Sequence, residues 1–119
     1  MGAPVIQWEI VSKNADELQK FYSELFDWKV NADNPLRYGL VDTRNERGIP
    51  GGIGDPQPGM EGRVTFYVMV DDLQKTLDKA EEMGGKTVMP PMDVPGAEPP
   101  VTLAMFQDPH VHLIGLTKS

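Results

Sequence analysis

The chain has 119 residues, of which 39% are apolar, 8% aromatic and 24% charged, and its net charge is −7. A chain of this length forms a single domain over residues 1–119, and the lack of cysteine excludes a disulfide framework and a thiol nucleophile. The acidic balance argues against nucleic acid and anionic membranes as partners. No apolar run approaches a membrane span of about 20 residues, and Met1 leads into no signal-peptide pattern, so we expect a cytoplasmic protein.

The first predicted elements are a strand over residues 5–11 and a helix over residues 14–28. Strand side chains alternate between two faces, so Trp8 lies on an apolar face while Gln7 and Glu9 share the opposite face. In the helical segment, apolar residues recur at spacings of three and four. This spacing predicts an amphipathic helix that covers the Trp8 face of the strand.

The same order returns in the second half of the chain. Residues 63–70 form a second predicted strand, with Val64 and Phe66 on the apolar face and Thr65 and Tyr67 on the other. A second amphipathic helix follows it and is expected to cover the apolar face. The faces of mixed polarity are candidate walls of a cavity, because they are neither plainly core nor plainly solvated.

The predicted helices have recognisable end signals. Asn14 suits an N-cap, and Glu17 three residues later can complete a capping box. Asp71 or Asp72 can cap the second helix, and Gly84 and Gly85 can supply the left-handed residue that ends it.

Three strands are predicted after each helix, over residues 28–32, 37–42 and 49–54 in the first half and 86–89, 101–107 and 111–117 in the second. Each half is then a strand, a helix and three strands. Self-similarity at half the chain length indicates two copies of one supersecondary unit. We therefore predict an α+β fold of two tandem βαβββ modules, about 1–58 and 59–119, forming a curved mixed sheet around a cleft.

Five segments resemble the vicinal-oxygen-chelate superfamily, which includes glyoxalase I, bleomycin-resistance proteins and extradiol dioxygenases. They are VIQWEI, FYSELFDWKV, GIPGGIGDPQPG, FYVMVDDLQKTLDKAEEMGGKTVMPPMDVPG and MFQDPHVHLIGL. The resemblance spans nearly the whole chain and is greatest to small glyoxalase-like proteins. It implies the paired-module fold and a homodimer, but it does not fix the activity, because the superfamily hosts many chemistries.

In metalloenzymes of this superfamily, the first and last strands of each module supply the metal ligands. The resemblance places these four positions at Gln7, Gly52, Thr65 and Gly115. Glutamine is a ligand in some glyoxalases, whereas two glycines and a threonine are unsuited to nickel, zinc or iron, which require imidazole and carboxylate ligands. We therefore expect no metal and no cofactor, and neither metal-dependent glyoxalase nor dioxygenase activity.

Glu9 and Tyr67 are the candidate catalytic residues, because they occupy equivalent places in the two modules. A carboxylate that faces a cavity can act as a base, with the tyrosine as a proton donor. The alternative is a Glu9 that is satisfied by a tyrosine, an arginine or the backbone. Arg37, Tyr38 and Arg63 can reach the same cavity and bind an anionic group, and the equal alternative for each is a solvated side chain.

The candidate ligand-binding residues are Gln7, Glu9, Thr65, Tyr67, Met69, Arg37 and Trp28. Met69 shares the cavity face of its strand, and methionine suits a wall for loosely fitting apolar ligands. Trp28 follows the first helix and is predicted to line either a pocket or an interface.

Two remaining segments are assigned to turns and loops. His110 and His112 are the only histidines. His110 belongs to a DPHV turn, in which the family that the chain resembles usually has a small residue at the position of Val111, and His112 lies in the following predicted strand on the face opposite Gly115. Residues 89–100 contain five prolines and are expected to form neither a helix nor a strand interior. We predict an extended loop there, serving either as a lid or as a rigid connector.

These patterns favour a metal-free cleft that binds a small molecule, in the manner of bleomycin-resistance proteins. A metal-independent lyase or isomerase that uses Glu9 and Tyr67 on a small oxygenated substrate is the first alternative, and a metal-dependent lyase of glyoxalase type is the second. The sequence names no ligand and does not decide between binding and catalysis, since both need the same pocket.

Overall fold

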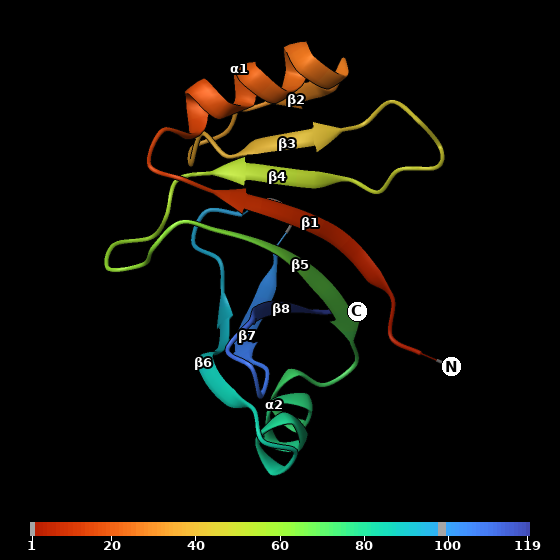
Figure 1. Ribbon diagram of the computed structural model, residues 1–119. Coiled ribbons are helices and arrows are strands. Elements are labelled where there is room, and N and C mark those ends of the chain that lie inside the picture. The colour runs from red at the N-terminus through yellow and green to blue at the C-terminus, as the bar shows by residue number, and fades with distance from the viewer. Residues whose placement is uncertain (1, 98–99) are drawn as a thin grey trace. The chain divides into compact units, whose positions relative to one another are not determined.

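A computed structural model describes residues 2–97 and 100–119. The chain divides into two compact units, one of residues Gln7–Thr65 and one of Phe66–Ser119 together with the residues up to Ile6. Within the described residues each unit contains one helix and four strands (Figure 1). None of the described helices is long and apolar enough to cross a membrane.

The Gln7–Thr65 unit contains β1 (Val5–Val11) from Gln7 onward, α1 (Ala15–Phe26), β2 (Lys29–Asn31), β3 (Gly39–Asp42) and β4 (Gly51–Gly54). Its strands are ordered β2-β3-β4-β1 (Figure 1). β1 pairs in parallel with β4, whereas β3 is antiparallel to both β2 and β4. This arrangement confirms the predicted order of one strand, one helix and three strands.

The core of this unit lies between α1 and the sheet. Its buried centre is Ala15, Val41 and Ile53, packed by Trp8, Ile10, Leu18, Tyr22, Trp28 and Val30. The helix therefore covers the Trp8 face, as predicted. The predicted capping box does not form, because the Asn14 side chain makes no capping hydrogen bond among the described residues. Asp27 ends the helix with a left-handed φ of 56°.

The second unit contains β5 (Arg63–Val70) from Phe66 onward, α2 (Leu73–Glu82), β6 (Lys86–Asp93), β7 (Thr102–Gln107) and β8 (Leu113–Lys118). The first three residues of β5 belong to the Gln7–Thr65 unit. Its strand order is β5-β8-β7-β6, with β5 parallel to β8 and the other pairs antiparallel. The buried core consists of Leu73, Leu77, Ala104 and Leu116. The carboxylate of Asp72 caps α2 by accepting the backbone N–H of Lys75 at 3.0 Å, and Gly84 follows the helix with a φ of 100°.

The proline-rich segment was predicted as a loop, but its first five residues, 89–93, extend strand β6. β6 ends the strand order, and proline is tolerated at a sheet edge because its missing N–H breaks no ladder bond there. The pairing with β7 shifts register between Thr87 and Met89 and again between Met89 and Met92. Residues 98 and 99 lie outside the described residues.

The predicted cover of β5 by α2 is only partly correct. Val68 and Val70 pack on the core beneath α2. In contrast, Val64 is 78% exposed and Phe66 is 40% exposed. The helix therefore covers only the C-terminal half of the strand.

Candidate functional site

The open face of the Gln7–Thr65 sheet, defined here as the face opposite α1, carries the polar side chains of this unit. Gln7 and Glu9 point to it because Trp8 between them packs beneath α1. Glu9 pairs with Gly52 of β4, so the glycine shares this face. The pairing of the remaining strands adds Lys29, Asn31, Leu40 and Asp42.

A hollow of about 300 Å³ opens on this face. Its lining includes Gln7, Lys29, Asn31, Leu40, Asp42 and Pro50. The Leu40 side chain offers apolar surface, since the residue is 55% exposed. Among the described residues, no hydrogen bond or ion pair engages the side chains of Gln7 and Lys29. The hollow therefore combines an apolar surface with an amide and an ammonium group that are available to a ligand.

Glu9 lies beside the hollow and is only 7% exposed. The Tyr38 hydroxyl donates to its Oε2 at 2.7 Å, and Nη2 of Arg63 lies 3.2 Å from its Oε1. Of the two roles predicted for Glu9, these contacts match a carboxylate satisfied by a tyrosine and an arginine. The Nε of Arg63 is buried and has no hydrogen-bond partner among the described residues.

Hydrogen bonds fix the backbone of Tyr38, and its ring lies against two glycines of β4. The Asn34 side chain donates to the Tyr38 carbonyl at 2.7 Å and accepts its N–H at 3.0 Å. A Cβ on Gly52 would lie 1.8 Å from the Tyr38 hydroxyl oxygen, and one on Gly54 would lie 2.5 Å from the ring. The ring therefore lies directly on the backbone of β4. Sequence reasoning did not identify this role, although two glycines alternating in a strand were a signal of close approach.

Other predicted site residues of this unit lie elsewhere. Trp28 packs on the α1 side of the sheet, with its ring centroid 5.1 Å from that of Trp8 and 4.9 Å from that of Phe26. It is therefore not on the open face. Arg37 is exposed and precedes Tyr38 with a left-handed φ of 52°. Thr65 is buried, with 5% of its surface exposed.

In the Phe66–Ser119 unit, Tyr67 and Met69 lie on the sheet face opposite α2. Tyr67 is 4% exposed and pairs with Gly115, where an added Cβ would lie 2.4 Å from the Tyr67 ring. Pairing across β8, β7 and β6 adds Thr117, Leu103, Met105, Met89 and Met92 to this face. The face of this sheet opposite α2, called the methionine face below, is therefore rich in methionine.

The positions that the family resemblance assigns to metal ligands do not fit a metal centre. Gly52 and Gly115 supply no side-chain ligand, and tyrosine rings fill the space that a side chain at either position would need. Gln7 and Thr65 offer only neutral oxygen or nitrogen donors. Within residues 2–97 and 100–119, no group of three or more histidine, aspartate or glutamate side chains is arranged to hold a metal ion.

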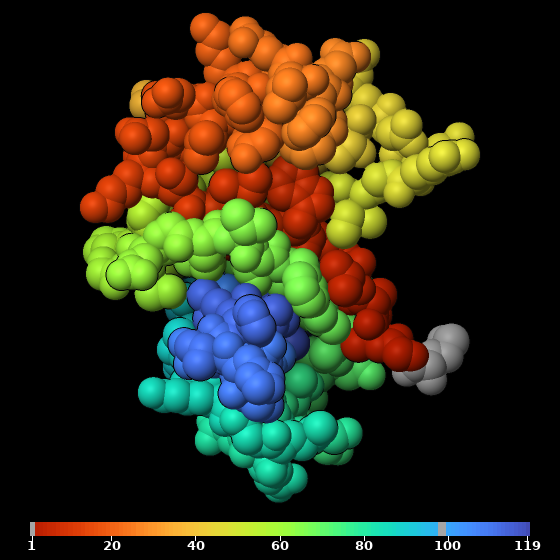
Figure 2. Space-filling model, in the orientation of Figure 1, coloured from red at the N-terminus to blue at the C-terminus, as the bar shows by residue number. Residues whose placement is uncertain are grey.

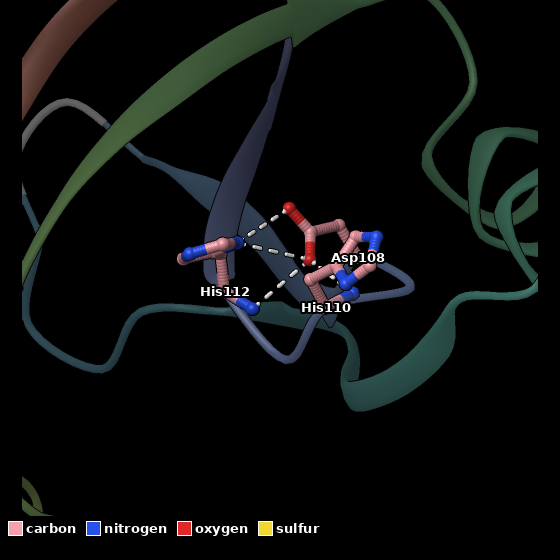
Figure 3. A network of polar contacts seen from close by, with 3 residues as sticks. All are labelled: Asp108, His110 and His112. Carbon is pink, nitrogen blue, oxygen red and sulfur yellow. Dashed lines mark hydrogen bonds and ion pairs between the residues drawn. The ribbon is translucent and has the colours of Figure 1, made fainter.

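Both histidines lie in the connection between β7 and β8 (Figure 3). This agrees with the turn predicted for His110, whereas His112 was expected in the strand over residues 111–117 and instead precedes β8, which begins at Leu113. One oxygen of Asp108 accepts the backbone N–H groups of His110 at 2.8 Å and His112 at 3.0 Å, and the other lies 3.0 Å from the His112 ring. The His112 N–H bond, the largest influence, helps to hold the pKa of Asp108 below its ordinary value of 3.8. Val111 adopts a left-handed φ of 70°, which glycine adopts more readily than valine.

Comparison with known proteins places this architecture in a family. Residues 5–116 match the model of the Glyoxalase/Bleomycin resistance protein/Dioxygenase superfamily. An anthracycline biosynthesis protein from Streptomyces peucetius, DnrV, is 38% identical over 126 residues, covering 91% of this chain and 44% of its own length. A glyoxylase-like domain-containing protein from Didymella fabae is 25% identical, covering 89% of this chain and 88% of its own length.

Among solved structures, a glyoxalase/bleomycin resistance protein/dioxygenase superfamily member from Vibrio splendidus 12B01 matches with a TM-score of 0.66 and 14% identity. The match covers 99% of this chain and 100% of that one. At this identity the match shows the fold alone. The chain spans less than half the length of several curated relatives, 44% for the Streptomyces protein and 39% for two mycobacterial proteins. The family model, which matches residues 5–116, shows that this chain belongs to the glyoxalase/bleomycin-resistance/dioxygenase superfamily.

Proposed function

We propose that this protein binds a small organic molecule, without a metal ion, on the open face of the Gln7–Thr65 sheet. The observation that carries this proposal is the hollow beside Glu9, whose volume of about 300 Å³ lies at the lower end of the usual range for ligand pockets. The neutral or absent donors at the expected metal positions support a metal-free mode of binding.

The lining of the hollow favours a small oxygenated ligand. The Lys29 ammonium can bind an anionic or carbonyl oxygen, and the Gln7 amide can donate to an oxygen or accept from a hydroxyl. Lys29 and Asp42 face each other across β2 and β3, yet they form no ion pair among the described residues. A ligand that carries both an acceptor and a donor can therefore engage the two groups at once. Leu40 supplies contact to its apolar part.

Two further observations support binding rather than turnover by Glu9. Both oxygens of the carboxylate already hold partners, Tyr38 and Arg63, so a metal-independent lyase or isomerase that used Glu9 as its base would first have to break these contacts. The Streptomyces relative is named for anthracycline biosynthesis, which supports small organic molecules as the class of partner.

Dimerisation is part of the proposal and is supported by the surface of α1. Phe21, Leu25 and Phe26 are each more than half exposed on this helix, which is orange at the top of Figure 2. A cluster of large exposed apolar side chains is typical of a protein interface. Light scattering coupled to size exclusion should report a dimer, and Phe21→Lys should shift it toward monomer. A wild-type monomer at about 100 μM would contradict this part of the proposal.

Thermal shift measurements test the binding function. The probes are small keto and hydroxy acids, tested alone, and Mn²⁺ or Ni²⁺, also tested alone. A ligand present at 100 times its dissociation constant adds about 2.7 kcal/mol to the free energy of unfolding. We expect stabilisation by an organic acid that is weakened in Lys29→Gln and retained in Lys20→Gln, a control on the exposed surface of α1. Stabilisation by a metal ion and by no organic probe would contradict the proposal.

A further inference from the structure

Tyr38 fills a slot on the open face of the Gln7–Thr65 sheet. Gly52 and Gly54 form the floor of this slot, and the Glu9 carboxylate closes its end. We propose that this slot is a binding site for one hydroxylated aromatic ring, and that Tyr38 occupies it until such a ring displaces it. The inference deepens the proposed function and rests on it, since both assign the open face to small molecules.

The shape of the slot is that of a flat ring. Added Cβ atoms on Gly52 and Gly54 would lie 1.8 Å and 2.5 Å from atoms of Tyr38, so the ring takes the space that side chains normally occupy above a strand. Two bare glycines thus leave a smooth backbone surface. An aromatic ring from another molecule can lie on the same surface, because the floor contributes no side chain that is specific to tyrosine.

The chemistry at the closed end selects a hydroxyl group. Oε2 of Glu9 accepts the Tyr38 hydroxyl at 2.7 Å, while Arg63 holds the other oxygen at 3.2 Å and fixes the carboxylate. A hydrogen bond to a charged acceptor is stronger than one between neutral groups. Displacement of Tyr38 by a phenol exchanges this bond to Oε2 for another of the same kind.

The filled slot leaves one polar atom unsatisfied. Nε of Arg63 is buried without a hydrogen-bond partner among the described residues, and a buried unpaired donor is costly. A ring that carries an oxygen acceptor in addition to its hydroxyl can supply the missing partner, which Tyr38 does not supply. This difference favours the incoming ring over the internal one.

Leu40 links the slot to the hollow. Leu40 pairs with Gly52 of the slot floor and lines the hollow, so it borders both. Asn34 holds the Tyr38 backbone from both sides, which lets the side chain rotate without moving the strand that follows. A ligand can therefore place its ring in the slot and the rest of its structure over Leu40.

Nuclear magnetic resonance titration with p-cresol, and with toluene as the matched ring without a hydroxyl, tests the inference. In the wild type, p-cresol should shift the Tyr38 ring signals toward those of an exposed tyrosine, and toluene should not. Tyr38→Phe keeps the ring but loses the competing hydrogen bond, so it should bind p-cresol about tenfold more tightly than the wild type. Tyr22→Phe, a control beneath α1, should bind p-cresol as the wild type does.

Tyr38 signals that stay unchanged up to the solubility limit of p-cresol would overturn the inference, as would equal affinities of Tyr38→Phe and the wild type. The two proposals can fail separately. If organic acids bind in a Lys29-dependent way and Tyr38 never moves, the slot is permanently filled and only this inference fails. If p-cresol displaces Tyr38 but stabilisation by organic acids is the same in Lys29→Gln as in the wild type, the proposed role of the hollow is wrong and the inference about the slot still holds.

Discussion

The two sheets share one topology and one kind of helix-covered core, yet their open faces differ in chemistry. The face in the Gln7–Thr65 unit is polar and charged, with Gln7, Glu9, Lys29, Asn31 and Asp42. Its counterpart in the second unit is apolar and polarisable, with Met69, Met89, Met92, Leu103 and Met105. The same βαβββ pattern thus supports two different surfaces.

This contrast shows which positions the repeated pattern constrains. Residues beneath a helix must be apolar in both units, because they form the core. Residues on the opposite face carry no such requirement and can diverge. Function is therefore expected where the two units differ, and four predictions test how far the difference extends.

The largest effect is expected from Arg63→Met. The substitution leaves the buried Glu9 carboxylate without its cationic partner, which should lower the free energy of unfolding by about 4 kcal/mol. Urea denaturation measures this, with the exposed Arg47→Met as the control. Most of the loss should be recovered in Glu9→Leu/Arg63→Met, where no unpaired charge remains. A loss of stability no larger than that of Arg47→Met would mean that the ion pair of Arg63 and Glu9 does not stabilise the folded chain.

Met105→Ala tests the packing of the methionine face, again by urea denaturation. Met105 is 1% exposed, and truncation of a buried methionine should cost about 3 kcal/mol through lost burial and a residual cavity. Met83→Ala, at a position that is 70% exposed, should change the stability little. The Met105→Ala loss should also be nearly independent of salt, since no charge is involved. A negligible loss would show that this face is not packed.

Gly52→Ala and Gly115→Ala compare equivalent positions of the two sheets directly. Each new methyl group overlaps a tyrosine, so each substitution should cost about 2 kcal/mol by overpacking, whereas Gly2→Ala meets no neighbour and should cost little. Thermal denaturation would measure the three variants. Tyr38→Ala should relieve the Gly52→Ala defect and leave the Gly115→Ala defect unchanged. Relief of both defects would contradict the conclusion that the new methyl group at residue 52 overlaps Tyr38 and the one at residue 115 does not.

The smallest effect is expected at the turn of the methionine-faced sheet. The pKa of Asp108 is lower in the folded chain than its ordinary value of 3.8. Its contribution to stability is therefore present above pH 3.8 and is lost as the pH falls through the lowered pKa. Denaturation of the wild type and Asp108→Asn at several pH values should show a difference that shrinks across this acidic window. A difference that is constant with pH would contradict the assignment.

Sequence patterns correctly predicted most residues that pack between a helix and its sheet. The periodicities around Trp8 and Leu77 report burial beneath a helix, and the structure places both residues in the expected cores. The same patterns failed for Val64, because β-strand alternation does not indicate how far along the strand a helix extends. They also failed at Pro90 and Pro91, because proline excludes a central strand but not an edge strand.

By itself, the sequence determined the order of elements in the two βαβββ units, the strand face that α1 covers and the residue types at the positions that the family resemblance assigns to metal ligands. These features follow from local spacing and from residue type. Only the tertiary structure decided that Tyr38 and Arg63 hold Glu9, at sequence separations of 29 and 54 residues. Local periodicity carries no information about which distant side chains meet, because strand pairing and the close approach allowed by Gly52 and Gly54 bring them together.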